Sequence, residues 1–516
     1  DWCLSRQVWW GHPVPAFECR VQNPGRKTDG KRWIAAETAA QARSKAAEWF
    51  AVPEQSVVIS PDTDVLDTWF SSSLLPLALA SMRRGPNDAQ TPYPLSMMET
   101  GKDILVFWVA RMMLMGMALG QGVMPFQDLV LHGLDLESSL RQNKAEGLLN
   151  EHEFSAALAE QNAAFPSGIP VCGADALRLT LLYSDVKSDR VRIDVDRARA
   201  MAAFANKIWQ ATRFVTQHNP EPIPSAETNL ERAKRPIDAW ILSQLASTVE
   251  KCDVGLRNYD FHVAVAALYE FWYGAFCDVY LEACKSVLWG PECDVKIGVR
   301  AVLDVCLDAG LRLLFPFMPH VTDELFHRYH RRCGASFQPP CESLIRAPYP
   351  VPEKWKQFEN PDLDAAFDEA FKLIEVLRKH KLGLKLGKVR PDVAVVWPNM
   401  AGHVVAQFRD VIVDLAKVNS LEFCLAEADV SSGFLLLAGP YPDVNVFMNV
   451  ERLNVDEEIA RRLVNIQKDL DGLKEKINSK KFSKIVPSRR LQIEKKYAAL
   501  EFEREQLAAA VKMQKS

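Results

Sequence analysis

The sequence predicts a mixed, mostly α-helical protein with more than one domain. Its 516 residues suffice for three or four domains, since one domain usually takes about 100–200 residues. Residues 198–315 carry apolar side chains at helical spacing over four long segments. Residues 362–452 mix helical and strand patterns, and residues 455–516 carry two heptad repeats. These observations predict a helical bundle, a small α/β module and a coiled coil.

The composition is that of an ordinary soluble globular protein, with 48% apolar and 25% charged residues. The net charge of −4 excludes a global basic field, so any nucleic-acid binding must come from local patches. The 11 cysteines include no Cys-x-x-Cys pair, which indicates a reduced, intracellular protein. No apolar run approaches the ~20 residues that span a bilayer, and we expect no membrane association.

The N-terminal region predicts short elements of both kinds. Residues 38–50 are Ala-rich and helical, and residues 57–59 and 129–132 are strand-like. Asp62, Asp64 and Asp67 follow the first of these strands. An acidic trio suits a divalent metal, but such aspartates more often cap turns, and Asp67 before Thr68 fits a cap. We therefore predict no metal site here.

Residues 99–113 run from an acidic, Gly-containing turn into an apolar segment of helical length. One interpretation is a buried helix whose start is capped by Glu99 and Thr100. The other is the floor of a pocket, in which Asp103 holds a cationic amine while Ile104 and Trp108 line a small apolar hole. The residues alone leave both open.

Four helices are predicted within residues 194–350, over 198–217, 237–256, 261–288 and 295–315. Lys207, Trp209 and Arg213 are expected near one face of the first. There Trp209 would stack on a base while Lys207 and Arg213 meet phosphates, or Trp209 would simply pack in the bundle. His320, His327 and His330 surround a basic run, which we interpret as a solvated helix end rather than a metal site.

The α/β module is expected over residues 351–453, and a Pro-rich linker, residues 348–361, leads into its helices and strands. The module should contain helices over 363–380 and 404–417. Its strands are expected over 393–397, 434–437 and 444–449. Its lysines at 379–388 are expected to be exposed.

Residues 454–516 predict an antiparallel coiled-coil hairpin. Heptad positions step 4, 3, 4, 3, 4 from Ile459 to Ile477 and again from Ile493 to Val511, and all of them are apolar except Arg504. Between them the turn is strongly basic, and an arm of about 24 residues reaches about 35 Å. A basic tip on such an arm is typical of a phosphate binder rather than of a plain solvated coiled coil. Its candidate contacts are Lys480, Lys481, Lys484, Arg489 and Arg490.

Five segments resemble motifs of the valyl-tRNA synthetase family of class I aminoacyl-tRNA synthetases, in family order. They are residues 1–16 (DWCLSRQVWWGHPVPA), 64–72 (DVLDTWFSS), 99–112 (ETGKDILVFWVARM), 168–178 (GIPVCGADALR) and 206–209 (NKIW). The resemblance covers nearly the whole chain. It implies a partial class I, Rossmann-like catalytic domain over residues 1–193, an α-helical anticodon-binding domain over 194–350 and a tRNA-binding arm at the C-terminus.

By the same resemblance the substrates are valine, ATP with Mg²⁺, and tRNA(Val). The valine pocket would be formed by six residues: Trp69, Glu99, Gly101, Asp103, Ile104 and Trp108. A rigid aromatic pocket of this kind separates one methylene by only about 1–3 kcal/mol. The zinc knuckle of some relatives is not expected, because only Cys19 is present in that region. The cytoplasm is the expected compartment, with the mitochondrion left open.

Two ATP-contacting signatures of the family are missing from the sequence. The chain begins at Asp1 inside a motif, so we expect that the His-Ile-Gly-His half of the fold precedes it. The Lys-Met-Ser-Lys-Ser loop should follow the strand that ends near His132, but Gly133 is followed directly by Leu134. We therefore predict that this chain does not form the adenylate unless a partner chain supplies the missing parts. The alternatives are a non-catalytic tRNA-binding protein and a structural coiled-coil adaptor.

Overall fold

The structure is a computed structural model, and it divides the chain into two compact units. Unit 1 comprises residues 1–164 and 186–192, and unit 2 comprises residues 165–185 and 193–516. The residues described are 2–21, 31–81, 93–145, 147–164, 168, 171–188, 190–191, 194–219, 230–331, 342–384, 386–397, 401–430, 434–449, 456–478, 490, 493, 496–498, 500, 501 and 504.

Unit 1 is built from short strands and helices. Its strands are β1 (Ser5–Arg6), β2 (Ala16–Val21), β3 (Lys31–Ala35), β4 (Val57–Pro61), β5 (Val65–Leu66), β6 (Leu95–Gly101), β7 (Phe126–His132), β8 (Leu134–Asp135) and β9 (Arg190–Val191). Its α-helices are α1 (Ala39–Phe50), α2 (Thr68–Ser73), α3 (Leu75–Ser81), α4 (Arg111–Leu119), α5 (Leu136–Ala145) and α6 (Glu151–Ala164). Its other helical turns are η1 (Glu54–Ser56), η2 (Lys102–Ile104) and η3 (Leu105–Ala110). Strands β3-β2-β4 form an antiparallel sheet that α1 covers, and β6 pairs with β7 in parallel.

Local chemistry fixes the starts of two of these helices. The Thr38 side chain accepts a hydrogen bond from the backbone N–H of Gln41 and caps α1. Asp67 caps α2 by accepting from the N–H of Trp69 at 3.2 Å. The predicted helix over 38–50, the strand over 57–59 and the capping role of Asp67 are therefore confirmed.

The segment 99–113 differs from the single capped helix of the first interpretation. Glu99 and Thr100 lie in strand β6, where their backbones pair with Val130 and Leu131 of β7, so they do not cap a helix. A 3₁₀ turn (η2) follows, then a π-helical turn (η3), and only then the α-helix α4. The capping prediction is wrong because sheet pairing satisfies the backbone groups that a helix start would use.

The junction at Gly133 joins strand β7 to the short strand β8. β7 ends at His132, Gly133 donates its N–H to the carbonyl of Val186 at 3.0 Å, and β8 then pairs in parallel with β9. α5 follows without an intervening loop. Lys144, near the end of α5, forms an ion pair with Glu151 at 2.7 Å and lies over the ring of Phe154.

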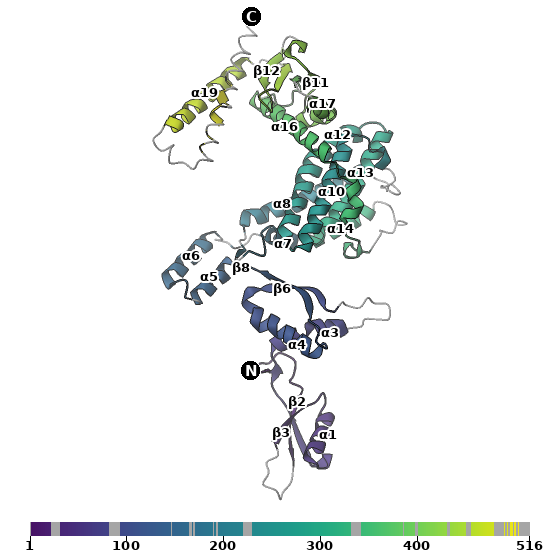
Figure 1. Cartoon of the computed structure of the whole chain (residues 1–516), viewed down its shortest axis with the longest axis vertical. Helices are drawn as coiled ribbons and strands as arrows, with labels where there is room; N and C mark the ends of the chain where they lie inside the picture. The colour runs from purple at the N-terminus through teal and green to yellow at the C-terminus, as the bar shows by residue number, and fades with distance from the viewer. Residues whose placement is uncertain are drawn as a thin grey trace. The chain divides into compact units, whose positions relative to one another are not determined.

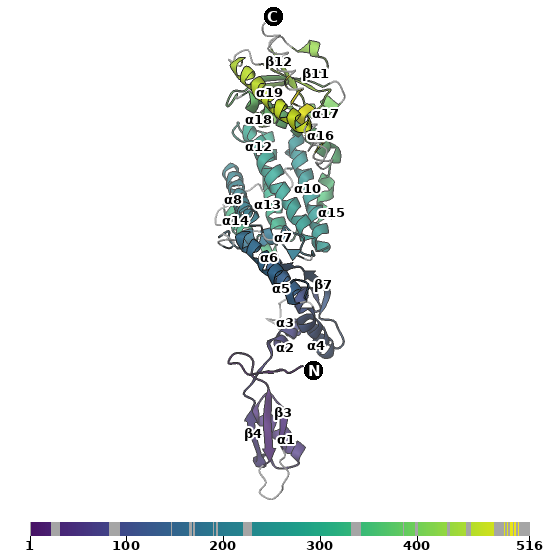
Figure 2. The same cartoon turned by 90° about the vertical axis from the view of Figure 1, so that its left-hand side faces the viewer.

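Unit 2 contains the helical bundle. Its first elements are α7 (Ala174–Leu182), α8 (Val195–His218), η4 (Leu230–Arg232), α10 (Pro236–Arg257), α11 (Phe261–Tyr269), η5 (Glu270–Tyr280), α12 (Leu281–Leu288), α13 (Asp294–Leu314), α14 (Pro319–Arg331), η6 (Leu344–Arg346), α15 (Pro352–Trp355) and η7 (Lys356–Phe358). α10 and α13 run side by side through the bundle (Figures 1 and 2). The four predicted helices are confirmed, but the third contains an 11-residue π-helical stretch, η5, between α11 and α12.

A buried charge network ties the bundle together. Arg235 and Asp238 at the start of α10 form an ion pair at 2.5 Å, and the phenol of Tyr280 donates to Asp238 at 2.8 Å. Arg235 also donates to the Ala283 carbonyl and the Cys284 sulfur. Burial opposes the charge on Arg235, yet its hydrogen bonds to Asp238 leave its pKa above the ordinary value. The network joins α10 to η5 and α12.

The α/β module follows in the same unit. Its elements are α16 (Pro361–Gly383), β10 (Asp392–Val396), α17 (Ala401–Ala406), α18 (Arg409–Ala416), β11 (Ser420–Cys424), η8 (Glu427–Asp429), β12 (Phe434–Ala438) and β13 (Asn445–Asn449). The strands are ordered β11-β10-β13-β12, with β10 and β11 parallel and the other pairs antiparallel. The prediction missed β11 and joined α17 and α18 into one helix. Lys381 is buried and donates to the Lys417 carbonyl, so it is not the exposed lysine that we predicted.

The C-terminal hairpin is described in part. α19 (Asp456–Asn478) forms its first helix, with Ile466 and Leu470 buried as the heptad pattern predicts. Residues described from the second repeat are helical as well, and Arg504 donates to the side chain of Gln467 at 3.2 Å. One buried cluster runs through the bundle, the module and these two heptad positions. Unit 2 therefore shares a continuous core.

Candidate functional site

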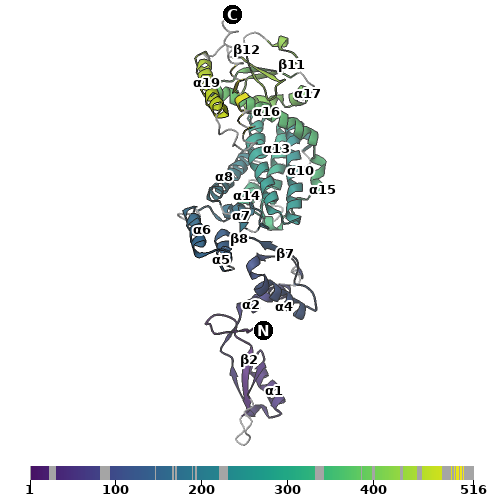
Figure 3. The ribbon, with the colours of Figure 1, turned by 60° about the vertical axis from the view of Figure 1, so that its left-hand side comes forward.

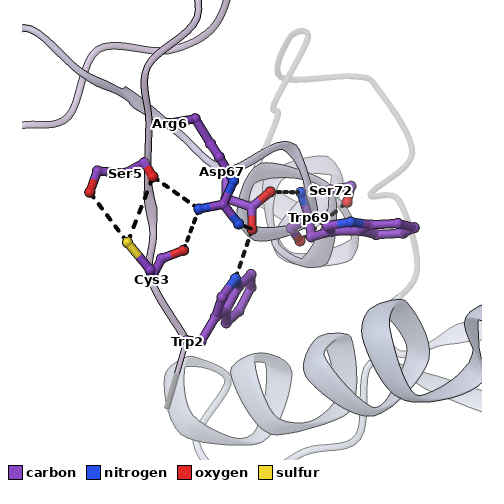
Figure 4. A network of polar contacts seen from close by, with 7 residues as sticks. All are labelled: Trp2, Cys3, Ser5, Arg6, Asp67, Trp69 and Ser72. Atoms are coloured by element: carbon purple, nitrogen blue, oxygen red, sulfur yellow. Dashed lines mark hydrogen bonds and ion pairs between the residues drawn. The ribbon is translucent and has the colours of Figure 1, made fainter.

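In unit 1 a single carboxylate, Asp67, connects the first residues of the chain to helix α2 (Figure 4). Its Oδ2 accepts hydrogen bonds from the indole N–H of Trp2 at 2.7 Å and from the guanidinium of Arg6 at 2.6 Å. Its Oδ1 caps α2, and its own N–H donates to the Leu4 carbonyl. Asp67 is 3% exposed, so the charge of Arg6 and these donors compensate for its burial.

We call this set of hydrogen bonds the Asp67 hub. It positions Trp69, whose indole points away from Asp67 in Figure 4. α2 packs against η3 and α4. From α4, Arg111 lies over the ring of Trp2 at 4.1 Å and over Phe107 at 5.5 Å. The same elements therefore hold Trp69 and the residues of the 99–113 segment in one neighbourhood of unit 1.

An acidic cluster lies where the ends of β6 and β7 meet. Glu99 of β6 contacts the imidazole Nδ1 of His132, and His132 is the register partner of Gly101. A Cβ placed on Gly101 would lie 2.5 Å from Oδ1 of Asp103 and 3.3 Å from Nε2 of His132. A side chain at this position would therefore require the Asp103 carboxylate and the His132 ring to shift.

The apolar candidates begin next to this cluster. Ile104 ends the 3₁₀ turn that carries Asp103. Trp108, in the π-helical turn, packs against the cluster of Val109, Met112 and Phe126. The indole N–H of Trp108 is buried and has no hydrogen-bond partner in the part of the chain that the structure describes. A buried donor without a hydrogen-bond partner costs about 1–3 kcal/mol.

The cluster contains one residue that the sequence analysis did not single out, His132. No motif marked it, and its place became apparent only from the parallel register that sets it opposite Gly101. Two carboxylates beside an apolar wall suit a small amino acid, with its ammonium at Asp103 and its side chain toward the indoles. Asp103 and Glu99 are exposed in the structure, so the cluster is open to solvent.

The three residues expected on one face of α8 are in different settings. Lys207 points to η5, where its ammonium pairs with Asp278 at 2.6 Å and lies 3.2 Å from the centre of the Tyr273 ring. Burial lowers and Asp278 raises the pKa of Lys207, and the net shift is upward. Trp209 packs against the bundle core and lies under the guanidinium of Arg328, and Arg213 is exposed. The prediction that Lys207 shares a face with the other two is wrong, since residues two apart on a helix point to different sides.

The histidines of α14 do not converge. His320 contacts Asp175 of α7 at 2.8 Å, and that carboxylate also accepts from the backbone N–H groups of His320 and Val321. His327 lies beside Asp323, and His330 packs on Phe326. Of the arm residues, Lys480, Lys481, Lys484 and Arg489 lie outside the described residues, and Arg490 is helical.

Comparisons with known proteins match two stretches of the chain. Residues 1–194 match the family "tRNA synthetases class I (I, L, M and V)", and residues 238–396 match "Anticodon-binding domain of tRNA ligase". The valine–tRNA ligase of Caenorhabditis elegans is 34% identical over 554 positions, which cover 99% of this chain and 52% of that protein. The chain belongs to the valine–tRNA ligase family.

Two human members of the valine–tRNA ligase family give a similar result. One is 38% identical over 76% of this chain and 33% of its own length, and the mitochondrial one is 34% identical over 92% and 46%. The chain thus spans about half of the length of its C. elegans relative, and a smaller share of the length of each of the two human relatives. The C. elegans match extends over 554 positions although this chain has 516 residues, so the relative has residues within the matched span that this chain lacks.

The described residues were also compared with the requirements of a membrane-spanning helix and of a metal site. None of the described helices is both long enough and apolar enough to cross a membrane. No group of three or more His, Cys, Asp or Glu side chains in the described ranges is arranged to hold a metal ion.

Proposed function

We propose that this chain binds tRNA through unit 2 and does not form valyl-adenylate by itself. The proposal rests on a contrast between two regions. The anticodon-binding region has a buried core, whereas the catalytic region continues through Gly133 without the expected loop. The matched residues 238–396 share one buried cluster with the rest of unit 2. In unit 1, by contrast, β7 passes through Gly133 into β8 and α5.

The junction at Gly133 supports the second half of the proposal. Adenylate formation requires fixed cations around the triphosphate and an in-line arrangement with the carboxylate of the amino acid. The family resemblance places a lysine-bearing loop after the strand that β7 represents, and this chain continues directly into β8. Lys144 does not replace that loop, because it pairs with Glu151 and lies over Phe154 on a regular helix.

Valine binding by unit 1 is the part of the family's function that is compatible with the loss of adenylate formation. Asp103 and Glu99 would hold the ammonium, and Trp69, Ile104 and Trp108 would enclose the side chain. Gly101 supports this assignment, since its missing side chain leaves room for the Asp103 carboxylate and the His132 ring. ATP, Mg²⁺ and tRNA(Val) are the other substrates of the family reaction.

On the tRNA side, Arg213 and Trp209 of α8 are the proposed contacts in the bundle, and the basic tip of the hairpin is the proposed contact in the arm. Lys207 would have to leave Asp278 to meet a phosphate. Its role in this proposal is therefore to hold α8 against η5, beside the surface that carries Arg213.

Two measurements on the purified chain test the proposal together. Valine-dependent exchange of labelled pyrophosphate into ATP should stay at the level of a no-valine control. Filter binding should show affinity for tRNA(Val) that falls as salt rises, because phosphate contacts release counterions. A matched variant carries a Lys-Met-Ser-Lys-Ser loop inserted between Gly133 and Leu134. Exchange by the unmodified chain above background would overturn the adenylate half, and salt-independent or absent tRNA binding would overturn the other.

A structural coiled-coil adaptor remains the competing function from a different class. It predicts protein partners for the hairpin and no tRNA affinity. The match to an anticodon-binding domain favours tRNA.

A further inference from the structure

The small antiparallel sheet of unit 1 has one covered face and one open face. Helix α1 packs on the face of the β3-β2-β4 sheet where Cys19 is buried (Figure 3). Side chains alternate along a strand, so the neighbours of Cys19 lie on the opposite face. That face carries four side chains that pair across β2 and β3: Glu18 with Trp33, and Arg20 with Lys31. The open face is therefore charged and aromatic.

A carboxylate on the open face holds two cations in place. Glu18 forms ion pairs with Lys31 at 2.5 Å and with Arg20. The Glu18 side chain is only 14% exposed, whereas those of Arg20 and Lys31 are 63% and 52% exposed. An ammonium and a guanidinium together have more N–H donors than one carboxylate accepts. A further anion can therefore bind both cations from the solvent side.

Trp33 lies beside these cations with much of its ring open to solvent. It is two residues from Lys31 along β3, so the two side chains point to the same side of the sheet. The residue is 49% exposed, which leaves room for a planar group on the indole. Proteins that hold single-stranded nucleic acid combine such rings, on which bases stack, with cations that meet the phosphates.

A second pair of a cation and an indole lies at the same edge of the sheet. β3 is an edge strand, and the guanidinium of Arg32 lies 3.3 Å from the centre of the Trp49 ring on the α1 side. Trp49 is also exposed. Strands β2 and β3 together carry three cations and one carboxylate, in a chain whose net charge is −4. Positive charge and open indoles therefore occur together along β3.

Protection of a sheet edge explains only part of this pattern. Lysine and arginine on an edge strand prevent pairing with another sheet, which accounts for Lys31 and Arg32. Edge protection does not account for Trp33 and Trp49, because exposed aromatic side chains favour association. Cations beside open rings suit a ligand that has negative charge and flat apolar groups in alternation. Unpaired nucleotides have both, whereas an acidic peptide has only the charge.

We propose that the open face and edge of β3 bind unpaired nucleotides of an RNA. A base stacks on Trp33, and the adjoining phosphates meet Lys31 and Arg20. The choice of RNA rests on the proposed function, in which this chain binds tRNA. The site itself is a separate one, because it belongs to unit 1 and lies outside residues 238–396, which match the anticodon-binding domain.

Short oligonucleotides test this site apart from the hairpin. Every protein used carries Lys480→Glu, Lys481→Glu and Lys484→Glu, so that the basic tip contributes little. Fluorescence anisotropy compares a short labelled oligoadenylate with an RNA duplex of the same length. The single strand should bind more tightly, because only unpaired bases can stack on an indole. Equal affinity for the duplex, or no binding of the single strand, would overturn the proposal.

Two changes at Trp33 measure the stacking. Trp33→Ala should weaken binding of the oligoadenylate by about fivefold to about a hundredfold, the usual effect of losing one stacked base. Trp33→Phe keeps an aromatic face and should retain most of the affinity. Trp289→Ala is the matched control, because Trp289 is an exposed indole of unit 2. Equal affinities of the two alanine variants, with unchanged circular dichroism, would remove Trp33 from the site and sink the proposal.

One change at Lys31 measures the phosphate contact. Lys31→Gln should lower the slope of log K against log salt by about 0.7, the value for one contact to a single strand. Arg43→Gln removes an exposed cation from α1 in the same part of unit 1 and is the matched control. The same slope in both variants would contradict the proposal. So would a glutamate-rich peptide that binds more tightly than the oligoadenylate, because the occupant would then be a protein.

The test also separates this site from tRNA binding by unit 2. With the hairpin lysines intact, Trp33→Ala should keep a salt-dependent affinity for tRNA(Val) in filter binding. A chain that fails to bind tRNA(Val) but binds the oligoadenylate through Trp33 would contradict the proposed function alone. A chain that binds tRNA(Val) but not the oligoadenylate would contradict the β3 site alone.

Discussion

At the scale of single residues, the candidate valine site depends on how backbone register brings distant side chains together. Gly101 and His132 are register partners on β6 and β7, and the absence of a side chain on Gly101 makes room for Asp103. Asp103 and Gly101 were recognisable in the sequence through their motif. His132 was not, because its contribution comes from pairing across the sheet.

The first residue-scale prediction concerns Asp103. Replacing it with Asn keeps the shape but removes the charge that would face the valine ammonium. Hydrogen bonds to charged groups contribute about 1.5–3 kcal/mol, so valine binding should weaken by about tenfold to about a hundredfold. Isothermal titration of valine into the chain measures this. Glu48→Gln, an exposed change on α1, is the control, and equal affinities for Asp103→Asn and the unaltered chain would remove Asp103 from the site.

At the scale of secondary-structure elements, the strongest apolar periodicities predicted their helices well. α8, α10 and α13 each lie within a few residues of the predicted bounds, because a single wide apolar face decides them. The prediction failed where sheet pairing or turn chemistry competes with periodicity. Glu99 and Thr100 went to β6, and the helix predicted over 404–417 is interrupted near Phe408, which caps α18 with non-helical backbone angles.

The sequence also did not predict the π-helical turns. In η3 and η5 the apolar pattern is as good as in an α-helix, and a hydrogen bond that spans one more residue than in an α-helix shifts which side chains are buried. The β11 strand was missed because its five residues, Ser420 to Cys424, mix polar and apolar side chains without a long run. Parallel pairing with β10 then fixes it.

The element-scale prediction concerns the hairpin. Changing Lys480, Lys481 and Lys484 to Glu should weaken tRNA binding and flatten its salt dependence. Each lost phosphate contact lowers the slope of log K against log salt by about 0.7–0.9. Filter binding at several salt concentrations measures the slope. Lys468→Glu, on the exposed side of α19, is the control; an unaltered slope in the triple variant would support a solvated hairpin without a role in binding.

At the scale of the whole molecule, unit 2 is held by one continuous core with few but costly polar interactions inside it. The Arg235–Asp238 pair is the clearest example, since Asp238 is fully buried and its carboxylate is shared with Tyr280. Removing one partner of a buried ion pair destabilises a protein far more than replacing both partners by apolar residues, because the remaining charge keeps its desolvation penalty.

We therefore predict that Asp238→Ala destabilises unit 2 by about 3–5 kcal/mol, the usual result of leaving one buried charge unpaired. Urea unfolding followed by helical circular dichroism measures the loss. Asp253→Ala is the matched control on the same helix, because Asp253 pairs with the exposed Arg257 and its removal should barely move the transition. Equal shifts in the two variants would show that the buried network contributes no more than a surface pair.

The Asp67 hub has a consequence for the order in which the chain folds. The cap of α2 also accepts hydrogen bonds from Trp2 and Arg6, which lie 65 and 61 residues earlier in the sequence. Closing such a loop costs entropy before any contact repays it, whereas α10, α11, η5, α12 and α13 pack largely against sequence neighbours. On the ribosome, Trp2 and Arg6 emerge before Asp67 and cannot form their hydrogen bonds until it follows. We therefore expect the helices of the bundle to form their native hydrogen bonds sooner after their own synthesis than the Asp67 hub does. Pulse-labelled hydrogen exchange during refolding orders the two events, and protection of Trp69 before that of α10 would contradict this sequence of steps.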